Sequence, residues 1–314
     1  MDRKLTPEAH LLERLRGLQK KIPDKFQEIL LQFYQCYKEA VGPAIDDCIP
    51  IVALFFQLME EQFKHPFSFE PYHQKIRHPI DYYRFSLDFV RPLIDLDHSK
   101  ILGQNILEEI DEQLKKGENV VLLANHQTEA DPQAIAILLE KTHPQIGEKI
   151  IYVAGERVVT DPFAIPFSMG CDLLCIYSKR YIDYPPELKA QKQHHNKSTM
   201  ELMSRLLKEG GKIIYVAPSG GRDRRNAKGV VEVAPFDPQS LEMFYLMARK
   251  AKTPTHFYPF SLATYDLLPP PETIQKELGE VRAAKRCPIH LAFAPEFNME
   301  KFPHSEENDK SIKR

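Results

Sequence analysis

From about residue 100 onward, the sequence alternates short, unbroken apolar runs with longer segments whose apolar residues recur at helical spacing. The apolar runs are Val120–Leu123, Lys149–Val153, Leu173–Tyr177, Ile213–Val216, His256–Ser261 and Ile289–Phe293. Unbroken runs of this length are typical of strands that are buried on both faces. The pattern therefore predicts an α/β fold with a mixed, largely parallel central sheet that is flanked by helices.

The first part of the chain has a different pattern, because its apolar residues follow a helical period and few glycines interrupt them. The residues on these helix faces are Phe26, Ile29, Leu30, Phe33, Tyr34, Leu54, Phe55, Leu58 and Met59. Three prolines at positions 66, 71 and 79 mark a joint after them. We predict a small N-terminal helical bundle over residues 1–72, which contributes packing only, and a larger α/β domain over residues 73–314 that carries the chemistry.

Composition limits the class of protein. The chain has 314 residues, 43% of them hydrophobic and 27% charged, with a net charge of −2. These values are ordinary for a soluble globular protein and give no argument for a nucleic-acid partner. The five cysteines are scattered, which predicts free thiols in a reducing compartment and no zinc site.

No targeting or membrane-spanning segment is expected. The longest apolar stretch, Ile49–Met59, is about half of a membrane span. The first residues resemble neither a secretory signal nor a transit peptide, because acids interrupt them. We therefore expect no transmembrane segment, although peripheral membrane contact stays open. The expected location is a bacterial cytoplasm, with the plastid stroma as the alternative for a mature chain.

A histidine and an aspartate, His126 and Asp131, lie five positions apart directly after the strand Val120–Leu123. A general base needs a proton-accepting nitrogen and a carboxylate that fixes its tautomer, and this pair supplies both. Asp131 followed by Pro132 is also typical of a helix start, with the aspartate as N-cap. The plainer alternative is a loop histidine beside such a cap, and spacing alone does not decide between them.

Two arginines form a second constellation. Arg222 and Arg224 follow the glycines 220 and 221, just after the strand Ile213–Val216. Guanidinium forks beside glycines suit a phosphate or a carboxylate, whereas the alternative is a solvated basic turn. If the two strands are parallel, the loops that carry His126 and Arg222 leave the same edge of the sheet and converge there.

Two further groups of residues are candidates. Lys179 and Arg180 follow the strand Leu173–Tyr177 and would add basic charge at the same sheet edge. Phe163, Ile165, Phe167 and Met169 follow a second Asp-Pro helix start and are a candidate acyl groove, although ordinary core is the favoured interpretation. His126 and Asp131 have no third ligand nearby, so we predict no metal and no cofactor.

Several segments together resemble the glycerolipid acyltransferases, and within them the soluble, plastid-type glycerol-3-phosphate acyltransferases. The matching segments are NHQTEADP at residues 125–132, AGERVVTDP at 154–162, PFSMG at 166–170 and PSGGRDR at 218–224. The likeness runs from about Lys100 to Pro295. The family has a small helical domain before a larger α/β domain, which agrees with the prediction above.

The resemblance implies transfer of a fatty acyl group from acyl carrier protein or coenzyme A to the 1-hydroxyl of glycerol 3-phosphate, which yields lysophosphatidic acid. It implies that His126 is the base, that Asp131 is its partner, and that Arg222 and Arg224 bind phosphate. A family basic cluster matches Lys179-Arg180-Tyr181, but the family commonly has Lys-Lys-His there, so the role of Tyr181 is open.

Two other functions remain open at this point. A non-catalytic protein that binds a phosphorylated metabolite or an acyl carrier would need the arginine loop but not His126. A lysophosphatidic acid acyltransferase would act on a membrane-held acceptor. The sequence has neither a G-x-S-x-G elbow nor a Walker A or G-x-G-x-x-G loop, which argues against a serine hydrolase and a nucleotide enzyme.

Overall fold

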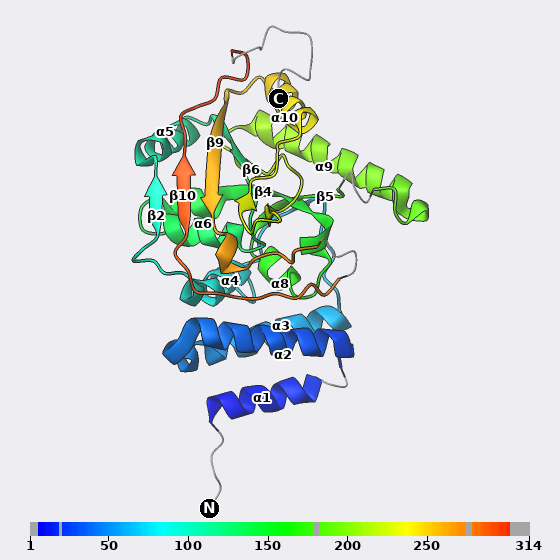
Figure 1. Cartoon of the computed structure of the whole chain (residues 1–314). Helices are drawn as coiled ribbons and strands as arrows, with labels where there is room; N and C mark the ends of the chain where they lie inside the picture. The colour runs from blue at the N-terminus through cyan, green and yellow to red at the C-terminus, as the bar shows by residue number, and fades with distance from the viewer. Residues whose placement is uncertain (1–5, 19–20, 179–181, 274–277, 302–314) are drawn as a thin grey trace, which may run out of the picture.

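The chain folds into a layered α/β structure beside a stack of helices. The computed structural model describes residues 6–18, 21–178, 182–273 and 278–301. Figure 1 shows the sheet and its helices above, with α3 and α2 beneath them and α1 outermost. This arrangement confirms the predicted fold class. The predicted domain boundary at residue 72 stays a prediction.

Within the described residues, eight strands form one sheet in the order β1-β5-β4-β6-β3-β9-β10-β2. The strands of this sheet are β1 (Tyr72–His73), β2 (Lys100–Leu102), β3 (Asn119–Ala124), β4 (Ile150–Gly155), β5 (Asp172–Ile176), β6 (Ile213–Val216), β9 (Thr255–Ala263) and β10 (His290–Phe293). From β5 to β9 all neighbours are parallel, while β10 and β1 run antiparallel to their neighbours β9 and β5. The predicted strands all occur, and the two short strands β1 and β2 had no recognisable pattern.

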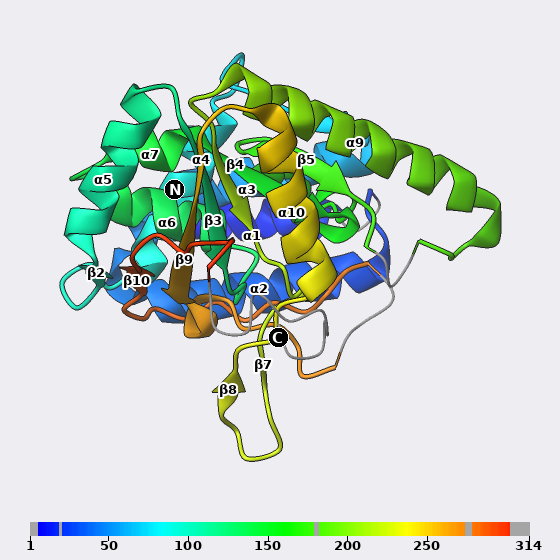
Figure 2. The ribbon, with the colours of Figure 1, turned by 90° about the horizontal axis from the view of Figure 1, so that it is seen from above.

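Helices cover both faces of this sheet, which explains why its central strands β3 and β6 are buried throughout. The helices are α1 (Pro7–Gly17), α2 (Asp24–Val41), α3 (Ile45–Lys64), α4 (Tyr82–Val90), α5 (Gln104–Lys115), α6 (Asp131–Leu139), α7 (Pro144–Lys149), α8 (Ile165–Ser168), α9 (Lys189–Glu209) and α10 (Pro238–Ala251). Val120 and Leu122 of β3 belong to a core with α5, α6 and α7. Val121 and Leu123 belong to a second core with α9 and α10. Figure 2 shows these two groups of helices on opposite sides of the sheet.

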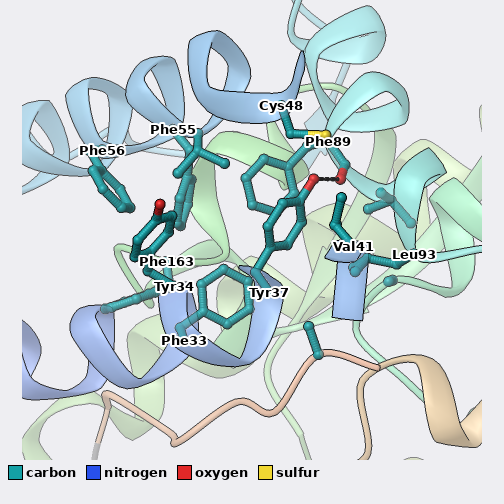
Figure 3. Close-up of a cluster of buried hydrophobic side chains, with 14 of the residues drawn as sticks. Phe33, Tyr34, Tyr37, Val41, Cys48, Phe55, Phe56, Phe89, Leu93 and Phe163 are labelled. Carbon is teal, nitrogen blue, oxygen red and sulfur yellow. Dashed lines mark hydrogen bonds between the residues drawn. The ribbon is translucent and has the colours of Figure 1, made fainter. Parts of the chain in front are cut away.

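The N-terminal helices share an apolar cluster with the rest of the molecule. Figure 3 shows Phe33, Tyr37 and Phe55 from α2 and α3 packed around Phe89 of α4 and near Phe163. The Tyr37 hydroxyl donates to the Phe89 carbonyl at 2.9 Å. The stretch Asp24–Lys64 is long and apolar enough to cross a membrane by length and composition alone, a test that core helices also pass. Here Phe55 and its neighbours in α3 are buried in the protein core.

One local feature confirms a sequence prediction, and a second was not predicted. The five cysteines are free, as predicted. A small hairpin, β7 (Arg224–Arg225) with β8 (Val231–Glu232), follows the arginine loop and was not predicted. It projects away from the body of the protein in Figure 2. Gly229, at its turn, has a φ of +76°, a conformation that favours glycine.

Candidate functional site

The loops that carry the candidate residues lie next to each other because their strands are parallel neighbours. Strands β3 and β6 pair in parallel with Leu123 opposite Val216, so the chain leaves both strands at the same sheet edge. The backbone amide of Asp223 donates to the carbonyl of His126 at 2.7 Å. The predicted convergence of the two loops is therefore observed, and it is fixed by a direct backbone hydrogen bond.

His126 and Asp131 are in contact, as general-base chemistry requires. His126 Nδ1 lies 2.8 Å from Asp131 Oδ2, and the histidine side chain is 28% exposed whereas the aspartate is 1% exposed. A carboxylate accepts, so Nδ1 carries the proton and Nε2 is left as the acceptor on the partly exposed ring. The pair thus combines a buried carboxylate with a partly exposed imidazole, the arrangement that a general base and its orienting acid would need.

Asp131 does not cap its helix, which corrects the sequence prediction. Helix α6 begins at Asp131, and its N-cap residue Ala130 makes no side-chain cap bond. The Asp131 carboxylate instead accepts from the backbone amides of Gln127 and Thr128, at 2.9 and 3.3 Å, and from the Thr264 hydroxyl at 2.6 Å. The loop before the helix bends back over the carboxylate. The amides of Gln127 and Thr128 therefore donate to Asp131 in place of amides from the first turn of the helix.

The loop around His126 is held rigid by strand β9 and by the neighbouring arginine loop. Asn125 exchanges hydrogen bonds with the backbone of Leu262, and its amide nitrogen also donates to Asp223 at 2.9 Å. The Gln127 side-chain oxygen accepts from the amide of Thr264 at 2.7 Å. Buried polar groups that are all bonded in this way fix the position of the base before any substrate arrives.

Arg222 and Arg224 have different surroundings. Arg222 Nη2 donates to both carboxylate oxygens of Glu280, at 2.7 and 2.8 Å, and Nη1 lies 3.7 Å from Glu129. The Arg222 side chain is only 10% exposed. Arg224 donates to the backbone carbonyls of Arg222 and Pro271, at 3.1 and 3.4 Å. Arg222 is therefore not part of a solvated turn, the alternative interpretation of the sequence.

Arg222 belongs to a buried network of alternating charges beside the base. Arg282 donates to Glu129 at 2.8 Å and to Asp161 at 3.1 Å, and Arg157 donates to Glu280 at 2.6 Å. Burial raises the pKa of Glu129, but the guanidinium groups of Arg282 and Arg222 outweigh burial and hold that pKa at about 2. Glu129 is therefore ionised throughout the physiological pH range.

Some predicted residues are not brought to this place. Lys179, Arg180 and Tyr181 lie outside the described residues. Phe163, Ile165 and Met169 are buried and Phe167 is partly buried, with Phe163 and Phe167 packed against Phe55 in the aromatic cluster. The structure places these side chains in or against the core, and the acyl groove stays a prediction.

The arrangement can move a proton beside guanidinium groups that are paired with carboxylates. His126 offers a base, and guanidinium groups within the adjoining loops suit an anion. Among the described residues, no group of three or more His, Cys, Asp or Glu side chains is placed to hold a metal ion.

Several residues of this site were missed by sequence reasoning. Thr264, Glu280 and Arg282 come from segments more than 130 residues after the histidine, and their contacts are set by the fold. Glu129 lies within the His126–Asp131 motif itself, which was a signal that could have been used. Arg157 lies in the segment 154–162 that carried the family resemblance.

Comparison with known proteins agrees with the resemblance that the sequence motifs carry. The family model described as Acyltransferase matches residues 105–263, about half of the chain. The chain is 40% identical over 274 residues to the chloroplastic glycerol-3-phosphate acyltransferase of Arabidopsis thaliana, a match that covers 85% of this chain and 60% of the relative. It is 43% identical over 263 residues to the enzyme of that name from Spinacia oleracea, covering 83% of this chain and 55% of the relative.

A third relative, from Pisum sativum and also named chloroplastic glycerol-3-phosphate acyltransferase, is 41% identical over 251 residues, with 80% of this chain and 55% of the relative covered. The chain therefore spans little more than half the length of these curated relatives. All of them are chloroplastic plant proteins. This finding overturns the expected bacterial cytoplasmic location.

Proposed function

The chain belongs to the acyltransferase family, and on that premise we propose that it transfers a fatty acyl group from an acyl thioester to the sn-1 hydroxyl of glycerol 3-phosphate. The product would be lysophosphatidic acid, the first intermediate of phospholipid synthesis. One observation carries the proposal: the His126–Asp131 pair adjoins the loop of Arg222, joined to it by the bond from Asp223. A base and an anion-binding group at one sheet edge match an acceptor with a hydroxyl and a phosphate.

The proposed reaction needs two proton transfers, one to His126 and one from it. His126 Nε2 removes the proton of the acceptor hydroxyl while its oxygen attacks the thioester carbonyl. Asp131 holds Nδ1–H and stabilises the imidazolium that forms. The tetrahedral intermediate then collapses with cleavage of the C–S bond, and the imidazolium returns its proton to the leaving thiolate. Since the thioester is already activated, no acyl-enzyme is required. General-base help of this kind contributes about 10²–10⁴ in rate.

Binding of the acceptor is assigned to basic groups around the base. We propose that Arg222 and Arg224 hold the phosphate, which presents the hydroxyl to His126. Lys179 and Arg180 are proposed to add to this charge on the strength of the family resemblance. Charge-assisted hydrogen bonds from guanidinium groups to phosphate are among the strongest that proteins make.

The donor and the compartment are finer points of the same proposal. Acyl carrier protein and coenzyme A both present an acyl thioester, and both are proposed donors. The names of the relatives support glycerol 3-phosphate over lysophosphatidic acid as acceptor, favour an enzyme over a binding protein, and support a plastid location.

A direct assay tests the proposal. Purified protein is incubated with glycerol 3-phosphate and a fatty acyl thioester of acyl carrier protein, and in parallel with the coenzyme A thioester, and the lipid products are separated. We expect 1-acyl-glycerol 3-phosphate with at least one donor. Product formation only when lysophosphatidic acid replaces glycerol 3-phosphate would establish the rival acceptor, and no product with either would exclude the enzyme.

A further inference from the structure

The buried carboxylate of Glu280 lies between two arginines of the candidate site. It comes from an irregular segment, residues 278–289, that crosses from the N-terminal helices to β10 and passes between the sheet and α2 in Figure 1. Lys25 Nζ donates to the carbonyl of Leu278 at 2.9 Å, which ties the start of the segment to α2. The Glu280 side chain is 2% exposed and points into the site.

Two arginines converge on one oxygen of this carboxylate. Glu280 Oε2 accepts from Arg157 Nη1 at 2.6 Å and from Arg222 Nη2 at 2.8 Å. Arg157 lies in the short 3-10 helix Glu156–Val159 after β4, whereas Arg222 follows β6, and these two strands are parallel neighbours. The two guanidinium groups are therefore placed to hold one anionic oxygen together, and Arg157 is not among the residues that sequence reasoning singled out.

Charge balance decides what happens when a phosphate arrives. Among the residues that the structure describes, the network joins three arginines, Arg157, Arg222 and Arg282, to three carboxylates, Glu129, Asp161 and Glu280. A phosphate added to this buried set would place a charge close to −2 beside the carboxylates of Glu280 and Glu129, and this repulsion is costly at low dielectric. One carboxylate must leave the arginines for a phosphate to bind them well.

Glu280 is the carboxylate that can leave. Asp161 is fully buried and is also bonded to the amides of Phe163 and Gly279, at 3.0 and 3.2 Å. Glu129 lies within the rigid loop between His126 and Asp131 and is paired with Arg282. Glu280 instead belongs to a segment without helix or strand. Its carbonyl accepts from Arg282 at 2.9 Å, but its carboxylate is bonded to Arg157 and Arg222 themselves.

We infer that Arg157 and Arg222 together form the cradle for the acceptor's phosphate, and that the Glu280 carboxylate occupies this cradle until phosphate displaces it. The inference rests on the proposed acceptor, glycerol 3-phosphate. Arg157 is then a binding residue for the substrate, and Glu280 is an internal competitor that keeps the two buried guanidinium groups paired in the empty enzyme.

Phosphate binding to charge-neutral variants tests this directly. Inorganic phosphate is titrated calorimetrically into the wild type, E280Q and the double variant R157Q/E280Q. We expect E280Q to bind phosphate on the order of ten-fold more tightly, because the competitor has lost its charge. Adding R157Q to E280Q should weaken phosphate binding on the order of ten-fold. R157Q alone is less informative, since it loosens both the phosphate and its competitor.

A matched control is available at the other end of α6. Glu140 also bridges two arginines, accepting from Arg91 at 2.7 Å and from Arg84 at 3.3 Å, but its side chain is 35% exposed. E140Q should leave phosphate binding unchanged. If E280Q does not fold, E280D replaces it, since a carboxylate shorter by one methylene retreats from the cradle and should also tighten phosphate binding.

The outcomes separate this inference from the proposed function. Equal or weaker phosphate binding by folded E280Q or E280D overturns the displacement, and an unchanged affinity when R157Q is added overturns the role of Arg157. Absence of phosphate binding in every variant overturns the cradle, even if the wild type acylates glycerol 3-phosphate. If the expected phosphate series is found but the wild type forms no 1-acyl product, the cradle stands and the proposed reaction falls.

Discussion

The backbone amide of Asp223 donates to the carbonyl of His126 at 2.7 Å, so the residue after Arg222 is bonded to the proposed base. Asp223 is itself fully buried, and its carboxylate accepts from the side chains of Asn125 and Gln127. This backbone bond therefore fixes the loop of the proposed base relative to the loop of the proposed anion-binding group. This relationship supports treating the two loops as one site in the experiments that follow.

Replacing His126 by alanine should abolish most turnover and leave acceptor binding nearly intact. The loss of a general base is expected to lower kcat about 10²–10⁴-fold. Steady-state kinetics give the rate, and calorimetry with glycerol 3-phosphate gives the affinity. His98 provides the control, because it pairs with Asp95 at the same 2.8 Å but is 77% exposed. A His126→Ala enzyme that keeps more than about a tenth of the rate is not using this base.

Thr264 should act on the rate through Asp131. Its hydroxyl donates to Asp131 Oδ1 at 2.6 Å, and Thr264→Val removes that donor while keeping the shape. We expect kcat to fall on the order of ten-fold with little change in KM for glycerol 3-phosphate, because a charge-assisted bond to the orienting acid is lost. Thr264→Ser keeps the hydroxyl and should restore the rate. Equal kinetics for the valine and serine variants would show that the hydroxyl does not matter.

Losing Arg222 or Arg224 should weaken acceptor binding. A charged hydrogen bond contributes roughly 1.5–3 kcal/mol, so KM for glycerol 3-phosphate should rise on the order of 10–100-fold in each alanine variant. Arg91→Ala, at the surface pair with Glu140, is the matched control. The phosphate role is wrong if both variants keep the wild-type KM.

Stability in acid should depend on Glu129. The folded-state pKa is held at about 2, below the ordinary value of 4.5, so the unfolded chain binds more protons between these values. The stabilisation by ionised Glu129 is therefore fully present above about pH 4.5 and is lost as the pH falls towards 2. The difference in unfolding free energy between wild type and E129Q, measured in urea, should shrink over that range. A difference that is constant with pH would contradict the ionised pair.

The aromatic cluster predicts a large effect on stability far from the chemistry. Phe55 is 1% exposed and touches the rings of Phe89, Phe163 and Phe167. Phe55→Ala should cost about 3–5 kcal/mol in unfolding free energy, through the lost burial and the cavity. Leu31→Ala on α2, where the side chain is 44% exposed, should stay within about 0.5 kcal/mol. Urea titrations compare the two.

The fold could be predicted from sequence because its main strands are buried on both faces. Unbroken apolar runs are found at β3 and β6, which are buried throughout and are parallel neighbours whose loops meet. Strands β1 and β2 could not be found this way. They have two and three residues, and pairing with β5 and β10 defines them rather than any pattern of their own.

The site was only half predictable for a related reason. His126 and Asp131 are close in sequence, so spacing predicts their contact, whereas Glu280 meets Arg222 across 58 residues through an irregular segment. Local rules also failed at Asp131, where helix-start statistics gave a cap. The loop amides and Thr264 compete for that carboxylate and win, because the fold brings them together.

The segment 278–289 also bears on how the molecule is assembled. Leu278 accepts from Lys25 across 253 positions, and a Cβ atom at Gly279 would lie only 3.1 Å from the ring of Phe26 and 3.3 Å from Ile29 of α2. The first helices are synthesised long before segment 278–289, so the part of α2 that this segment contacts is uncovered until then. Contacts of such sequence separation form late and slowly. Completion of the packing around α2 therefore depends on a segment that lies 253 positions later in the chain, and a chain that stops before it leaves this part of α2 uncovered.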